Sequence, residues 1–140
     1  MKADTVLLGL ALAFLVLGCR SGDGWQSVEI PMPTSAPQVV YERKPLSEFQ
    51  FIGTEQVRRL HIGDTTLVDL PVQPSLAFED SVYLARDSSG YRLYLKEEYV
   101  GAIVNLRAAT VREDRADRAG VFLGVVGGRE ALKFTPASKH

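Results

Sequence analysis

The feature that most constrains the fold of this chain is a series of short β-rich runs that begins near Val39 and continues almost to the C-terminus. Hydrophobic and polar residues alternate within several of these runs, as they do in strands that bury one face. Gly63-Asp64, "RDSSG" and Gly127-Gly128 separate neighbouring runs and are typical of hairpin turns. About eight short strands at this spacing predict a mainly β domain, either a small antiparallel sandwich or a barrel.

One segment, residues 106–119, fits two structures. Asn105 is a suitable N-cap, Gly120 suits the position after a helix, and the alanines and arginines between them favour a helix. Thr110 and Val111 instead favour continuation of the preceding strand, followed by a charged loop. The sequence therefore leaves open one short helix near 106–119 or a strand that ends near Val111.

The N-terminal residues have a different character from the rest of the chain. Thirteen uncharged residues run from Thr5 to Leu17, and the charged and small residues "RSGDG" follow at 20–24. This run has the length of the hydrophobic region of a signal peptide, and it is shorter than the roughly 20 residues that a helix needs to span a bilayer. Residues 1–18 are therefore predicted to be a signal peptide that is removed.

The apolar run ends in Val16-Leu17-Gly18-Cys19, and Cys19 is the one cysteine of the chain. A single cysteine cannot form an intrachain disulfide. The four residues resemble the bacterial lipobox: an aliphatic residue, a small or aliphatic residue, glycine or alanine, and then cysteine. This resemblance to bacterial lipoproteins implies diacylglycerol transfer to the sulfur of Cys19, cleavage after Gly18 and acylation of the new amino terminus. Two or three acyl chains hold a protein on a membrane, where one chain binds only marginally.

The residue after the cysteine bears on localisation. In lipoproteins of bacteria with two membranes, sorting commonly depends on this position, where aspartate favours retention in the inner membrane. The chain has Arg20 here. The resemblance therefore implies a lipid-anchored protein on the periplasmic face of the outer membrane. For a protein at this place, we expect an envelope protein complex or a cell-wall component as the partner.

Residues 19–38 are predicted to be a flexible tether behind the lipidated cysteine, because they show little periodicity and are rich in glycine and proline. Trp25 fits a tether poorly; it suits either the lipid headgroup region or the edge of a folded core. The remaining residues divide into a single mainly β domain, 39–136, and a C-terminal tail, 137–140.

Candidate catalytic residues are few. The formal net charge of −1 excludes a global basic field for nucleic acid. No serine lies in a nucleophile elbow, and no glycine-rich phosphate loop occurs, so no cofactor is predicted. An envelope enzyme with a site built from scattered residues around His61, Asp64 and Asp69 is the alternative function, although Asp64 also suits a turn.

Two sets of residues are candidates for binding a partner. The first is the arginine cluster Arg112, Arg115 and Arg118, which would line one side of a helix and could dock a carboxylate- or phosphate-rich partner, or simply form a solvated surface. The second is a group of tyrosines that either pack in the sheet or form an exposed platform for a glycan or a peptide: Tyr83, Tyr91, Tyr94 and Tyr99. A non-enzymatic accessory or binding module is therefore the favoured function.

Overall fold

The structure is a computed structural model of the 140-residue chain. It describes the residues 16–17, 19–20, 24–45, 56–73, 79–96, 101–114, 120–128 and 131–138. Within these ranges the chain forms strands joined by turns, and none of the described residues is helical. Accordingly, the described part of the chain contains no helix of the length and apolarity needed to cross a membrane.

Five strands form an antiparallel meander with the order β2-β3-β4-β5-β6. The strands are β2 (Cys19–Arg20), β3 (Gln26–Ile30), β4 (Val39–Pro45), β5 (Gln56–Ile62) and β6 (Thr66–Gln73). Alternate residues of β5 are buried along its whole length, as expected of a strand with one face on the core. Tyr41 lies opposite Leu60 on one side and Val28 on the other, so the same register that pairs the backbones brings buried side chains together.

The other seven strands form an antiparallel sheet with the order β1-β12-β11-β7-β8-β9-β10. The strands are β1 (Val16–Leu17), β7 (Glu79–Asp87), β8 (Gly90–Lys96), β9 (Gly101–Asn105), β10 (Thr110–Asp114), β11 (Val121–Gly127) and β12 (Lys133–Pro136). β7 to β10 form a meander, and β11 then returns to pair with β7 instead of β10. A bulge between Phe122 and Gly124 interrupts the β11–β7 pairing.

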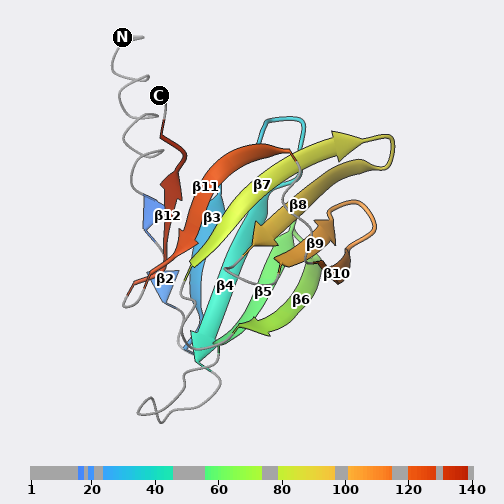
Figure 1. Cartoon of the computed structure of the whole chain (residues 1–140). Coiled ribbons are helices and arrows are strands. Elements are labelled where there is room, and N and C mark those ends of the chain that lie inside the picture. Colours follow the sequence, from blue (N-terminus) through green and yellow to red (C-terminus); the bar gives the residue numbers. More distant parts are fainter. Residues whose placement is uncertain are drawn as a thin grey trace.

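The two sheets lie face to face and enclose one hydrophobic core (Figure 1). At one lateral edge β12 lies against β3, and at the other β10 lies against β6. Both strand orders are open, so the predicted mainly β antiparallel fold is confirmed in its sandwich form. The core contains aliphatic residues of both sheets together with one tyrosine and one phenylalanine, among them Val28, Ile30, Val39, Tyr41, Leu60, Val82, Leu93, Leu95, Val104 and Phe134.

The prediction of a short helix over residues 106–119 is wrong for residues 106–114, which are not helical. Residues 106–109 form a turn, and β10 follows as an edge strand in which Val111 pairs with Val104 and packs against the core. Burial of this β-branched residue decides for the strand, because a helix at this place would lose the pairing with β9. Residues 115–119 lie outside the described residues.

Residues 19–38 were predicted to be a flexible tether, but the structure places part of this segment, β3, in a sheet. β3 pairs with β4 along its length, and Val28 and Ile30 are buried in the core. Trp25 is also buried, in agreement with the second interpretation offered for it, in which it covers a core edge. Proline obscured this strand in the sequence, because three prolines lie in the connection between β3 and β4: Pro31, Pro33 and Pro37.

Candidate functional site

The outer face of the seven-stranded sheet carries a continuous row of large side chains. The register places Phe122 of β11 opposite Tyr83 of β7, and Tyr83 opposite Tyr94 of β8. Tyr94 in turn lies opposite Ile103 of β9, and Ile103 lies opposite Arg112 of β10. The residues that flank Tyr83, Tyr94 and Ile103 along their strands are all buried in the core, so these three side chains point away from it. The register places Phe122 and Arg112 on the same face. We call these five residues the cross-strand row.

The cross-strand row is apolar and exposed at its β11 end. The rings of Tyr83 and Phe122 pack with their centroids 5.2 Å apart and their planes at 43°. Phe122 is 40% exposed, and the adjacent Val121 is 69% exposed. Exposed aromatic and aliphatic side chains that adjoin one another in this way are typical of surfaces that contact a partner.

At its other end the cross-strand row enters a hollow of about 420 Å³ in the surface. Its lining residues come from β8, β9 and β10 and are Arg92, Ile103, Asn105, Thr110, Val111 and Arg112. Ile103 is only 6% exposed. It belongs to β9, between the strands that supply the two arginines, and therefore forms the floor. The hollow thus combines two guanidinium groups, an amide and a hydroxyl with an apolar base.

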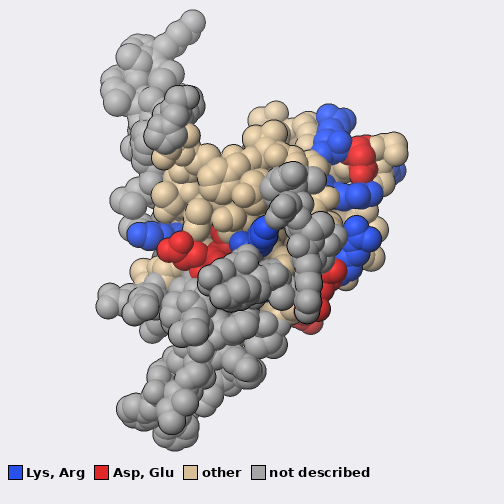
Figure 2. Space-filling view, in the orientation of Figure 1, with Lys and Arg blue, Asp and Glu red and all other residues tan. Residues whose placement is uncertain are grey.

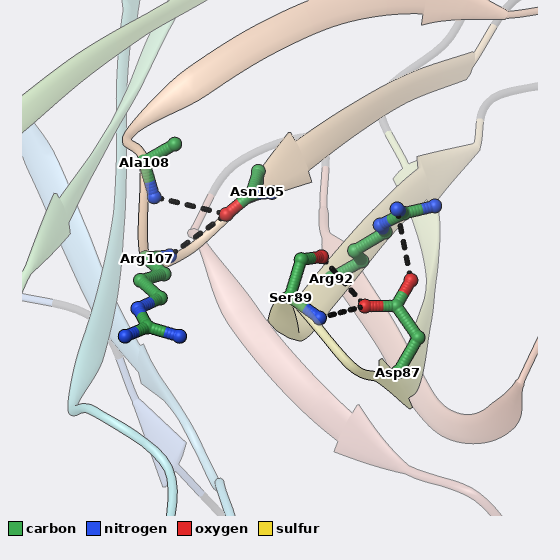
Figure 3. A network of polar contacts seen from close by, with 6 residues as sticks. All are labelled: Asp87, Ser89, Arg92, Asn105, Arg107 and Ala108. Carbon is green, nitrogen blue, oxygen red and sulfur yellow. Dashed lines mark hydrogen bonds and ion pairs between the residues drawn. The ribbon is translucent and has the colours of Figure 1, made fainter.

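Arg92 is held at the rim of the hollow by the β7–β8 turn. Its Nη2 lies 2.8 Å from Oδ2 of Asp87, and both side chains are partly exposed. The other carboxylate oxygen of Asp87 accepts hydrogen bonds from Oγ and the backbone N–H of Ser89 at 2.6 and 2.8 Å (Figure 3). These hydrogen bonds, helped by the charge of Arg92, lower the pKa of Asp87 below its ordinary value. The carboxylate therefore stays ionised and keeps Arg92 in place.

Asn105 is positioned by the neighbouring β9–β10 turn. Its Oδ1 accepts hydrogen bonds from the backbone N–H groups of Arg107 and Ala108 at 3.0 and 2.9 Å (Figure 3). The turn closes with a backbone hydrogen bond from Ala109, which has a φ of 57°, to the carbonyl of Asn105. Because the turn uses the oxygen of the amide, its NH₂ group is left to donate toward the hollow.

Two further arginines lie at this end of the sheet, Arg86 near the end of β7, on the same side of the sheet as Tyr91, and Arg107 on the β9–β10 turn. The guanidinium of Arg86 lies over the ring of Tyr91 at 5.2 Å, and Arg107 is exposed on the β9–β10 turn. Figure 2 shows basic side chains gathered at this end of the molecule, around the β7–β8 hairpin and β9, with acidic ones among them. The surroundings of the hollow therefore favour an anionic ligand.

The residues predicted as binding candidates lie in different places in the structure. Arg112 lines the hollow, whereas Arg115 and Arg118 lie outside the described residues. Tyr83 and Tyr94 belong to the cross-strand row. Of the other two tyrosines, Tyr91 packs against the core and shares a hydrogen bond with Ser35, and Tyr99 lies outside the described residues.

The residues of the alternative enzyme site lie on the other sheet. His61 makes a 2.6 Å contact through Nε2 with Oε1 of Glu42, and Nε of Arg59 donates to the same oxygen at 2.6 Å. Asp69 is exposed opposite Arg59, and Asp64 is exposed in the turn between β5 and β6. None of the three predicted residues lines the hollow, and the described residues contain no cluster of acidic, histidine or cysteine side chains suited to a metal ion.

A buried polar cluster connects the two sheets. Nη1 of Arg58 lies 2.6 Å from Oδ2 of Asp80, and the hydroxyl of Tyr41 donates to the same oxygen at 3.1 Å. Arg58 also donates through Nη2 to the carbonyl of Pro71 at 2.8 Å. Burial, and after it the charge of Asp80, raise the pKa of Tyr41, so the phenol stays protonated as a donor. We assign this cluster to holding the sheets together.

Sequence reasoning missed several residues of the hollow: Arg92, Ile103, Asn105 and Thr110. A signal for Arg92 was present, because it alternates with the buried Leu93 along a strand that the sequence predicted. Comparisons with protein-family models, with curated proteins and with solved structures found no match to this chain.

Proposed function

We propose that this protein is a membrane-anchored bacterial lipoprotein that acts as a non-enzymatic binding module in the cell envelope. The anchor is supported by the thirteen-residue apolar run that ends in Gly18-Cys19. The binding role rests on one observation, the hollow with Arg92 and Arg112 at the end of the cross-strand row. A hollow that combines an apolar floor with a few fixed polar groups is the usual form of a recognition site.

The position of Cys19 affects how the domain would sit on the membrane. The backbone of Cys19 and Arg20 pairs with β3, so the attachment point adjoins the five-stranded sheet. Cleavage after Gly18 would remove β1 and leave β12 as the edge of the other sheet. The seven residues from Cys19 to the start of β3 span at most about 23 Å when extended. The domain would therefore lie close to the leaflet instead of on a long tether.

Lipidation can be tested by mass spectrometry of the protein purified from membranes of a bacterial host. We expect acyl chains on Cys19 and a new amino terminus at this residue. Cys19→Ser should accumulate as an uncleaved, unlipidated precursor, whereas Ser21→Ala, two residues away, should be processed normally. An unmodified thiol at Cys19 in the mature protein would show the anchor to be wrong.

A further inference from the structure

We infer that the hollow binds a carboxylate of an acidic peptide segment in a partner protein, while an apolar residue of the same segment packs on Tyr83 and Phe122. This inference rests on the binding role proposed above and names the class of ligand for that site. It follows from the chemistry of the hollow, the geometry of the Tyr83 and Phe122 rings and the distance between these two parts of the surface.

The carboxylate is favoured by the groups that converge on the hollow. Arg92 and Arg112 enter it from the strands on either side of β9. Each guanidinium carries five N–H donors, so Arg92 keeps donors for a ligand while one nitrogen contacts Asp87. Arginine binds planar carboxylates through two parallel hydrogen bonds, and such charge-assisted bonds are about twice as strong as neutral ones.

The apolar floor strengthens this binding. Ile103 excludes water beneath the guanidinium groups, and a charge pair interacts more strongly where the local dielectric constant is low. The turns on either side reduce the entropic cost, because Asp87 already holds Arg92 and the β9–β10 turn already holds Asn105. A carboxylate on a short apolar stem, such as a glutamate side chain, fits these surroundings.

The rings of Phe122, which is exposed, and Tyr83, which is half-buried, favour a peptide over a glycan. Tyr83 and Phe122 lean on each other at 43°, so they form no common plane on which successive sugar rings of a glycan could stack. An aliphatic or aromatic side chain can pack against the surface of such tilted rings. The row from β11 to β10 crosses four strand intervals, about 19 Å. An extended peptide of about six residues has this length.

Fluorescence anisotropy with the full chain in detergent micelles tests the inference. The probe is a labelled hexapeptide, blocked at both ends, with two glutamates near one end and a phenylalanine near the other. We expect binding that weakens about tenfold when glutamine replaces both glutamates of the probe, and about tenfold in either Arg92→Gln or Arg112→Gln. Phe122→Ala should weaken binding about threefold. Lys133→Gln, which removes an exposed cation of the same sheet, should have no effect.

A charge exchange separates recognition from misfolding. Arg112→Glu should bind a lysine version of the peptide more tightly than the glutamate version, which a merely unfolded variant would not do. Failure of the glutamate peptide to bind at about 1 mM would overturn the inference, as would equal binding of the glutamine peptide. Tighter, Arg112-dependent binding of an oligogalacturonate would overturn it in favour of an acidic glycan.

The peptide-binding measurement does not depend on an acyl chain. A negative result in it can therefore be told apart from a negative result in the test for lipid on Cys19. Absence of peptide binding by protein that carries lipid on Cys19 would overturn the ligand class alone. Arg112-dependent peptide binding by protein with an unmodified Cys19 would overturn the anchor alone.

Discussion

At the scale of single residues, the polar cluster of Arg58, Asp80 and Tyr41 places an ion pair inside the hydrophobic core. Charges are seldom buried unless they are paired, because removing them from water costs several kcal/mol each. Here a carboxylate of the seven-stranded sheet meets a guanidinium of the five-stranded sheet, and both are almost completely buried. Their attraction fixes the position of one sheet against the other, which aliphatic contacts alone specify less strictly.

Asp80→Asn should therefore destabilise the protein by about 3–5 kcal/mol, because it leaves the charge of Arg58 buried without a counter-charge. The double variant Arg58→Met, Asp80→Leu should recover most of this loss, since apolar side chains of similar volume remove both charges. Chemical denaturation measures both effects. Asp87→Asn, at the exposed pair with Arg92, is the matched control and should change stability little. A double variant less stable than Asp80→Asn would contradict this account.

The raised pKa of Tyr41 predicts a dependence of stability on alkaline pH. A tyrosine of the unfolded chain loses its proton near pH 10. The native state keeps the proton on Tyr41, so above this pH it binds more protons than the unfolded state. The stabilisation that protonated Tyr41 gives the native state is complete below pH 10. Above this pH it declines by up to about 1.4 kcal/mol per pH unit. From pH 9 to pH 11 the unfolding free energy of the wild type should therefore fall relative to that of Tyr41→Phe. A constant difference would show that the unfolded and native pKa values are alike.

At the scale of elements, local pattern predicted the strands whose turns are marked by glycine and whose residues alternate. The β7–β8 hairpin is such a case, since the stretch "RDSSG" lies at its turn and Leu93 and Leu95 face the core as expected. β3 was missed because it has five residues, lies among glycines and prolines, and becomes recognisable only through its pairing with β4. Long-range pairing also explains the incomplete prediction of the site. Phe122 meets Tyr83 only because β11 returns to β7, and Arg112 joins Arg92 because β10 is a strand and not a helix.

β3 should be necessary for folding. A chain that begins at Gln38 lacks Trp25, Val28 and Ile30, three buried side chains whose burial contributes about 2 kcal/mol each. It also leaves β4 as an unpaired edge. We expect this chain to melt far below one that begins at Ser21, or to lack a cooperative transition in circular dichroism. Melting temperatures within a couple of degrees would instead show that residues 21–37 are dispensable, as a tether would be.

At the scale of the whole molecule, Cys19, the proposed site of the anchor, and the hollow lie toward opposite lateral edges of the sandwich. β2, which contains Cys19, pairs with β3 at the edge where β12 also lies, whereas β10 and its Arg112 lie beside β6 at the other edge (Figure 1). Acyl chains on Cys19 would therefore hold one edge against the leaflet and leave the hollow near the edge that lies farther from it. This arrangement suits a module that meets its partner in the aqueous space beside the membrane, and the side of the envelope that it faces depends on sorting.

If Cys19 is the lipid anchor that we propose, sorting is predicted to depend on Arg20, the residue that follows it. In a host with two membranes we expect the wild-type protein to band with outer-membrane markers on a density gradient. Arg20→Asp should move it to the inner-membrane fractions, because aspartate at this position favours retention in lipoproteins of the kind that the chain resembles. Arg20→Ser is the matched control: it removes the same positive charge without introducing aspartate, and it should leave the protein in the outer membrane. β2, in which Arg20 lies, has only two residues and forms a sheet edge. Wild-type protein in the inner-membrane fractions, with no response to Arg20→Asp, would place the domain at the inner membrane and assign sorting to another signal.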